Sequence, residues 1–209
     1  MSHFGIHTSI KKGFLKDEKI IEAFSDIDRA EFLPENFYKE SLSDVALPIG
    51  YGQAISQPSV VALMLSLLDA REGQKVLDIG SGSGWTVALL CHIVGRNGYV
   101  GAIERIEKLL EWGKKNVDKY GYVKDGKEGQ AEFFLADGSK GLSKRAPFDR
   151  ILVSAFSDFI PPVLKEQLKI GGKMVIPIKN NLWFLEKKDS DKFEQKIYPG
   201  FSFVPLIKD

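Results

Sequence analysis

The chain has little cysteine and histidine, and it lacks long hydrophobic runs. Its 209 residues include one cysteine, Cys91, so no internal disulfide can form and we expect a reducing, cytoplasmic location. The three histidines, His3, His7 and His92, show no spacing typical of metal ligands, and we expect no metal site. Apolar stretches such as residues 60–68 are far shorter than the roughly 20 residues of a transmembrane helix. We therefore expect a soluble protein without a membrane partner.

An excess of charge of either sign is also missing. Lysine and arginine number 29 against 28 acidic residues, which gives a net charge of +1. Such a chain has no global field to attract polyanions, so we expect no nucleic-acid partner. The first ten residues, MSHFGIHTSI, lack the apolar core of a secretory signal. A hydrophobic share of 44% and a charged share of 27% are ordinary values for a folded globular domain.

The first 58 residues predict a helical segment followed by a loop. Apolar residues recur at near-helical spacing between Lys16 and Tyr38, and Pro34 breaks this pattern. Residues 44–58 read DVALPIGYGQAISQP, which is dense in glycine, proline and small polar residues. This composition disfavours a regular element and indicates a long ordered loop or a binding loop.

Short apolar runs then alternate with helical patterns, which is typical of a doubly wound, mostly parallel α/β sheet with helices on both faces. We divide the chain into an N-terminal segment with an acceptor loop (1–58), a Rossmann-like core (59–180) and a C-terminal β-hairpin with a terminal strand (181–209). The expected helices after the loop are 59–70, 85–94, 106–120 and 161–168. The expected strands are 75–79, 99–103, 131–135, 151–154, 173–178, 182–187 and 193–198, the last two flanking a polar turn at 188–191.

A glycine-rich loop follows the first strand of the core. Residues 75–85 read KVLDIGSGSGW, in which glycines allow a sharp turn and a close approach to a ligand at the carboxyl end of a parallel strand. A dinucleotide fingerprint would continue as GxGxxG, but residue 85 is Trp. The spacing is GxGxG, with Asp78 two residues before the first glycine, and this favours S-adenosylmethionine over NAD.

Acidic residues end the next two strands. Glu104 lies twenty residues beyond Gly84, where a carboxylate can accept both hydroxyls of a ribose. Its alternative is a solvated side chain paired with Arg105. Asp137 and Gly138 end the third strand and could present a carboxylate and a backbone amide to an adenine edge, although a simple Asp-Gly turn would look the same.

The residues after the fourth strand bear on the methyl acceptor. Methyltransferases that act on the amines of bases usually place Asn or Asp there, followed by Pro-Pro and an aromatic residue. This chain has Ser154-Ala155-Phe156 instead. The sequence therefore disfavours methylation of a nucleobase amine.

A chain of motifs resembles the protein-L-isoaspartate O-methyltransferase family from about Asp28 to Ile207. They are LPIGYGQAISQP, VLDIGSGSGW, IERI, ADG, APFDRILV, LKEQLKIGGKMVIP and FVPLI, in that order. The GQxIS segment is the part specific to this family, because GxGxG alone indicates only a class I methyltransferase.

The resemblance implies methyl transfer from S-adenosylmethionine to the free α-carboxylate of an L-isoaspartyl residue, with S-adenosyl-L-homocysteine as the product. The ester then closes to a succinimide, and hydrolysis restores some normal aspartyl linkage. The protein's partners would be damaged proteins and peptides, with Ser56 as the catalytic residue and with Gln53 and Ile55 in substrate binding. We expect the protein to be monomeric or weakly associating. The residues assigned to the cofactor are Asp78, Gly80, Ser81, Gly82, Ser83, Gly84, Glu104, Asp137 and Gly138.

Other interpretations remain open from the residues. Without the resemblance, Ser56 is better explained as a cap for the helix that begins near Pro58. Ala54 stands where the family commonly has Thr, and Phe156 stands where a smaller residue is usual. These departures leave room for a class I methyltransferase with another acceptor, such as RNA or a small carboxylic acid, or for a silent cofactor-binding protein.

Overall fold

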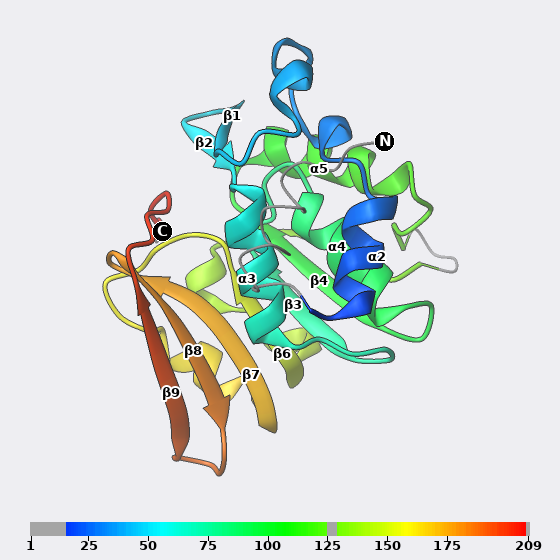
Figure 1. Ribbon diagram of the computed structural model, residues 1–209. Helices are drawn as coiled ribbons and strands as arrows, with labels where there is room; N and C mark the ends of the chain where they lie inside the picture. Colours follow the sequence, from blue (N-terminus) through cyan, green and yellow to red (C-terminus); the bar gives the residue numbers. More distant parts are fainter. Residues whose placement is uncertain (1–15, 125–128, 208–209) are drawn as a thin grey trace.

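A seven-stranded sheet forms the centre of the structure (Figure 1). The computed structural model describes residues 16–124 and 129–207. The strands are ordered β5-β4-β3-β6-β7-β8-β9 across the sheet. Their bounds are Lys75–Ile79 (β3), Tyr99–Glu104 (β4), Ala131–Leu135 (β5), Phe148–Val153 (β6), Leu168–Ile178 (β7), Asn181–Lys187 (β8) and Phe193–Pro199 (β9).

The strands from β5 to β7 in this order are parallel. The chain winds outward from β3 through β4 to β5, and it then returns to β6 on the other side of β3. This reversal creates a switch point beyond the carboxyl ends of β3 and β6, where doubly wound sheets bind ligands. The central strands are buried on both faces, as the neighbouring residues Val76 and Leu77 illustrate: both are 0% exposed, and they belong to the two opposite buried clusters. The predicted doubly wound, mostly parallel fold is confirmed.

Helices cover both faces of the sheet, but unequally. Among the described residues, four α-helices contribute to one buried cluster, and a short helix contributes to the cluster on the opposite face, where residues next to two 3₁₀ turns also pack. The first group is α2 Glu18–Asp26, α3 Pro58–Leu68, α4 Trp85–Val94 and α5 Glu107–Asp118. The second group is α6 Pro162–Glu166, η3 Gly138–Lys140 and η4 Ser143–Arg145.

The N-terminal segment is less helical than predicted. Asp17 caps α2 by accepting from the amide of Lys19 at 3.0 Å, but the helix ends at Asp26 because Ile27 is extended. The chain continues in two 3₁₀ turns, η1 Arg29–Phe32 and η2 Glu35–Glu40. The expected helix over 161–168 is likewise shortened, because Leu168 already pairs with β6 as the first residue of β7.

The composition of the stretch 44–58 predicted a loop without regular elements, but the structure differs. The stretch forms a small antiparallel hairpin of β1 (Leu47–Gly50) and β2 (Gln53–Ile55), which stands apart from the main sheet (Figure 1). The turn has positive φ at Gly50, Tyr51 and Gly52. The inward residues of the two strands are apolar and buried, so this hairpin is anchored to the core.

The C-terminal hairpin closes the other edge of the sheet. β7, β8 and β9 pair antiparallel, which confirms the predicted hairpin. After β9 the chain crosses back toward the switch point, where Phe156 and Pro205 form an isolated bridge. Within residues 16–124 and 129–207, the helices are all too short or too polar to cross a bilayer. His3 and His7 lie outside the described residues.

Candidate active site

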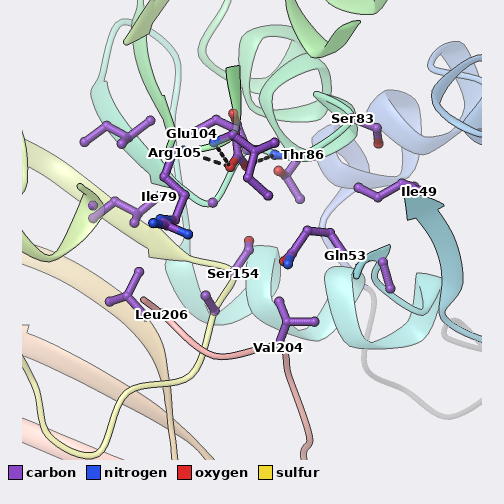
Figure 2. A pocket seen from close by; sticks show the side chains of 18 of the residues that line it. Ile49, Gln53, Ile79, Ser83, Thr86, Glu104, Arg105, Ser154, Val204 and Leu206 are labelled. Atoms are coloured by element: carbon purple, nitrogen blue, oxygen red, sulfur yellow. Dashed lines mark hydrogen bonds between the residues drawn. The ribbon is translucent and has the colours of Figure 1, made fainter. Parts of the chain in front are cut away.

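An open cleft of about 850 Å³ lies at the switch point of the sheet (Figure 2). Its walls come from the loops after β3, β4, β5 and β6, the β1–β2 hairpin, and the C-terminal residues 204–207. In Figure 2, Glu104 lies on one side of the cleft and the segment with Val204 and Leu206 on the opposite side.

Most of the predicted site residues line this cleft, although three do not. The cleft brings together Gln53, Ile55, Ser56, Gly80, Ser81, Gly82, Ser83, Glu104 and Gly138. Asp78, Gly84 and Asp137 are not among the lining residues, because each is engaged in holding the surrounding loops.

The glycine loop is fixed from two sides. The amides of Gly80 and Ser81 both donate to the carbonyl of Ile103 in β4, at 2.9 and 3.0 Å. The side-chain amide of Asn116 in α5 donates to the carbonyl of Ser83 at 3.0 Å. This backbone is therefore held in place by the protein itself, before any ligand binds.

Gly84 has a packing role at the start of α4. Its φ is +89°, and a Cβ at this position would lie 2.7 Å from the carbonyl oxygen of Gly113 and 2.8 Å from a methyl group of Val117. The third glycine of the motif thus allows α5 to approach the loop closely, rather than contacting a ligand.

Asp78 lies behind the loop with no exposed surface. Its Oδ2 accepts a hydrogen bond of 2.6 Å from the hydroxyl of Thr86, whereas Oδ1 has no partner among the described residues. Burial raises the pKa of Asp78 to about 7; the hydrogen bond from Thr86 opposes this, and the nearby Glu104 carboxylate adds to it. Asp78 therefore has a structural role, in which it links the end of β3 to the start of α4.

Glu104 joins the glycine loop to the start of α5. Its Oε2 accepts from the amide of Gly82 at 3.0 Å, and its Oε1 accepts from the amides of Arg105 and Ile106 at 2.8 and 2.9 Å (Figure 2). A carboxylate offers about four lone-pair sites, so three amides leave room for about one more hydrogen bond. The alternative of a solvated side chain is wrong, because Glu104 is 6% exposed.

Of the two residues expected at the adenine edge, Asp137 and Gly138, only Gly138 lines the cleft. The Oδ1 of Asp137 caps the η3 turn by accepting from the amide of Ser139 at 2.8 Å, and its Oδ2 lies 3.5 Å from Nζ of Lys140. Gly138 lines the cleft and packs against Ile79. The simple-turn interpretation therefore describes Asp137 well, while Gly138 remains available to a ligand.

Ser56 follows the β1–β2 hairpin and lines the cleft. Helix α3 begins after it with Gln57 as the N-cap, and no side-chain hydrogen bond caps this end from that position. Asp44 instead accepts from the amide of Ser59 at 2.8 Å. The interpretation of Ser56 as a helix cap is therefore wrong, because Gln57 takes the N-cap position and Ser56 lines the cleft.

The β1–β2 hairpin, which leads into Ser56, packs against the glycine loop. Ile49 of β1 packs over Gly82, so closely that a Cβ on Gly82 would lie 3.2 Å from the Ile49 Cδ1. Ile55 is buried and Gln53 is half-buried, with the Gln53 amide donating to the carbonyl of Tyr51 at 3.3 Å. The two predicted binding regions therefore form one continuous surface.

Several contacts of the site could not be predicted from the sequence. The C-terminal segment was recognised only as the motif FVPLI, and its position at the cleft was not predicted. The amide of Phe156 donates to the carbonyl of Val204 at 2.8 Å, and the carbonyl of Phe156 accepts from the amide of Leu206 at 2.7 Å. Phe156 itself is not a lining residue, so this departure from the usual family pattern does not change the wall of the cleft. Thr86, Asn116 and Arg29 were also missed, because their contacts depend on distant parts of the chain.

The cleft suits a polar nucleoside cofactor. The hydroxyl of Ser81 is buried at the cleft and has no hydrogen-bond partner among the described residues. Because a buried polar group without a partner is destabilising, this hydroxyl is suited to bind a polar ligand. The half-buried backbone of Gly80 and Gly82, Glu104 and the apolar side chains of Ile79 and Leu206 surround the same space. The fold and this site define a class I S-adenosylmethionine-dependent methyltransferase.

Comparison with known proteins gives the family. The family model described as protein-L-isoaspartate(D-aspartate) O-methyltransferase matches residues 4–209. A protein-L-isoaspartate O-methyltransferase of Methanopyrus kandleri is 41% identical over 199 residues, covering 93% of this chain and 86% of the relative. Protein-L-isoaspartate O-methyltransferase 1 of Archaeoglobus fulgidus is 43% identical over 190 residues, covering 90% of this chain and 85% of the relative.

Solved structures agree with the observed fold. A candidate protein-L-isoaspartate O-methyltransferase of Plasmodium falciparum, in complex with S-adenosyl-L-homocysteine, superposes with a TM-score of 0.84 over 99% of this chain and 98% of its own, at 21% identity. Another structure described as a protein-L-isoaspartate O-methyltransferase gives a TM-score of 0.86 at 27% identity, over 98% of this chain and 65% of its own. The chain belongs to the protein-L-isoaspartate(D-aspartate) O-methyltransferase family.

Proposed function

We propose that this protein methylates the free α-carboxylate of L-isoaspartyl residues in damaged proteins and so begins their repair through a succinimide. The observation that carries this proposal is the shared cleft, in which the acceptor loop with Ser56 meets the glycine loop and Glu104. Family membership over residues 4–209 supports the same reaction.

The cofactor residues divide by what they offer. Ser81 and the backbone of the glycine loop would bind the polar part of S-adenosylmethionine, and Glu104 would bind a ribose hydroxyl through its remaining lone pair. Ile79, Ile106 and Leu206 would cover the apolar surface of the adenine. When bound, S-adenosylmethionine supplies the methyl group.

The chain needs no strong base for this reaction. A carboxylate with an ordinary pKa of about 4 is already ionised at neutral pH, so the requirement is alignment for in-line displacement. The hydroxyl of Ser56 would donate a hydrogen bond to one carboxylate oxygen and leave the other free to accept the methyl group. The lining residues accordingly include neither histidine nor lysine.

The walls of the cleft would limit access of water. The β1–β2 hairpin approaches the glycine loop through Ile49, and residues 204–207 cross the opposite side (Figure 2). An anion and a cation neutralise one another along the reaction path, so a less polar surrounding favours transfer. Both segments would serve this exclusion.

The setting of the reaction is part of the same proposal. The partners are proteins and peptides that contain isoaspartyl residues, and the protein acts on them as a monomer in the cytoplasm. The buried free thiol of Cys91 is compatible with a reducing compartment. The net charge of +1 gives no reason to expect a nucleic-acid partner.

Reversed-phase chromatography coupled to mass spectrometry would test this function on one isoaspartyl peptide, because the isoaspartyl and aspartyl forms have equal mass and must be separated before detection. With enzyme and S-adenosylmethionine, we expect the peptide to pass through a methyl ester and a succinimide and to accumulate the normal aspartyl form. A peptide that stays unchanged, while the enzyme binds S-adenosyl-L-homocysteine, would overturn the proposal.

A further inference from the structure

A buried arginine behind the cleft connects the N-terminal segment to the loop that carries Ser56. Arg29 lies in the η1 turn and is 5% exposed. Its Nη1 donates to the carbonyl oxygens of Ser41 and Ser43 at 3.0 and 3.2 Å. Its Nη2 donates to those of Val45 and Ser56 at 2.8 and 3.2 Å. Both terminal nitrogens thus bind backbone on both of their N–H groups.

The burial of this guanidinium has a free-energy cost that offsets the stability gained from its hydrogen bonds. The Nε of Arg29 is buried without a partner among the described residues. Burial also lowers the pKa of Arg29 to about 10, although Asp44 opposes this, so the guanidinium stays charged at neutral pH. A buried charge with an unpaired donor is weak evidence for a purely stabilising role. What the guanidinium does provide is one rigid plane that fixes four carbonyls.

The same guanidinium also contacts the start of α4. Its central carbon lies 5.4 Å from the centre of the Trp85 ring, and Trp85 lines the cleft directly after the glycine loop. Arg29 therefore contacts both walls that meet at the site, the acceptor loop and the beginning of α4.

We propose that Arg29 is a positioning residue for methyl transfer, which holds the Ser56 carbonyl and so aims the Ser56 hydroxyl into the cleft. This inference rests on the function proposed above and on the role of Ser56 in it. The carbonyl carbon of Ser56 is bonded to the Cα that carries the side chain, so holding this carbonyl restricts where the Cα and its side chain can lie. The side-chain torsion then selects among the staggered positions of the hydroxyl. Lysine cannot replace this contact, because one ammonium with three donors cannot bind four carbonyls held by two nitrogens.

The test compares Arg29→Lys with Arg150→Lys. Arg150 is a matched control, since it is 7% exposed and donates to the carbonyls of Asp69 and Asp149 at 3.0 and 2.8 Å, away from the lining residues of the cleft. Each variant is assayed for kcat and KM with an isoaspartyl peptide, for the Kd of S-adenosyl-L-homocysteine by calorimetry, and for Tm.

The Arg29→Lys variant should lose about tenfold or more in kcat/KM for the peptide, with its cofactor Kd within about twofold of wild type. The Arg150→Lys variant should keep both values within about twofold while losing a comparable Tm. Because Arg29 acts through Ser56, adding Arg29→Lys to Ser56→Ala should lower kcat/KM by less than about twofold further. Arg29→Gln, which removes the buried charge, repeats the comparison if Arg29→Lys does not fold.

Three results would overturn this inference: unchanged peptide kinetics in the folded Arg29 variant, an equal loss in the Arg150 variant, or additive losses in the double variant. The proposed function fails separately, if the wild-type enzyme leaves the isoaspartyl peptide unmethylated. A Ser56→Ala variant with wild-type turnover would overturn the role of Ser56 and, with it, that of Arg29.

Discussion

Thr86 in the first turn of α4 donates a hydrogen bond of 2.6 Å to Asp78, the buried carboxyl at the end of β3. The bond joins the strand before the glycine loop to the helix after it, so the loop is closed at its base. It also opposes the burial that raises the pKa of Asp78 to about 7. This carboxyl is therefore both a structural support and a titrating group near neutral pH.

The Asp78→Asn variant should gain stability relative to wild type as the pH rises. The pKa of Asp78 is about 7 in the folded state and about 4 in the unfolded state, so the folded protein binds more protons between these values. Its contribution is present below about pH 4 and is lost as the pH rises to 7, by at most about 4 kcal/mol. Urea unfolding at pH 5 and pH 8 measures the difference, and an equal difference at both would contradict the assignment.

Thr86→Val should act in the opposite direction. It keeps the carboxyl but removes the hydrogen bond that lowers the pKa of Asp78. The free energy of unfolding should then fall more steeply between pH 5 and pH 8 than in wild type. Identical slopes would show that the hydroxyl does not control this titration.

Ser56→Ala and Glu104→Ala should separate turnover from cofactor binding. Ser56→Ala should lower kcat about tenfold or more, with a nearly unchanged Kd for S-adenosyl-L-homocysteine. Glu104→Ala should mainly weaken that Kd, since it removes the carboxylate that binds the amides of Gly82 and Ile106. Calorimetry and initial rates measure both, and equal effects on cofactor affinity would refute this division of roles.

Gly84→Ala should destabilise the protein strongly. A methyl group there would meet the Gly113 carbonyl at 2.7 Å, in a backbone with φ +89°. We expect a loss of roughly 2–4 kcal/mol by urea unfolding. Gly73→Ala is the matched control, because Gly73 has φ +75° but open space around it, and it should lose only about 1 kcal/mol. Equal losses would mean that the close packing on α5 is unimportant.

Leu206→Ala should weaken cofactor binding about fivefold, because Leu206 lines the cleft and lies beside Gly138. Ile197→Ala on the exposed face of β9 is the control and should leave the Kd unchanged, since Ile197 is 49% exposed. Binding of S-adenosyl-L-homocysteine by calorimetry measures both variants. An unchanged Kd in Leu206→Ala would remove the C-terminal segment from the cofactor site.

The core of the fold could be predicted because its signals are local. Strand β3 and helix α4 lie where the apolar runs placed them, with the glycines of the loop between them marking the boundary. The hairpin over residues 47–55 could not be predicted in this way. Its strands are only four and three residues long, β1 itself contains Pro48 and Gly50, and Gly52 lies in the turn between the strands.

Candidate site residues could be predicted where their residue types form a recognisable motif. They were missed where their position depends on contacts between distant parts of the chain. Glycines, Glu104 and Ser56 stand out in a motif. By contrast, Arg29 binds carbonyls up to 27 residues away, and backbone carbonyls leave no mark in a sequence. Asp137 shows the converse: it stands out as a candidate ligand, yet its carboxylate caps the adjacent turn.

The most direct test of the central claim is transfer of labelled methyl from S-adenosylmethionine to one short peptide in two versions. The versions carry L-isoaspartyl or normal L-aspartyl at the same position, so they differ only in the path of the backbone. We predict labelling of the isoaspartyl peptide alone. Equal labelling of both peptides, or labelling of neither by enzyme that binds S-adenosyl-L-homocysteine, would contradict the account.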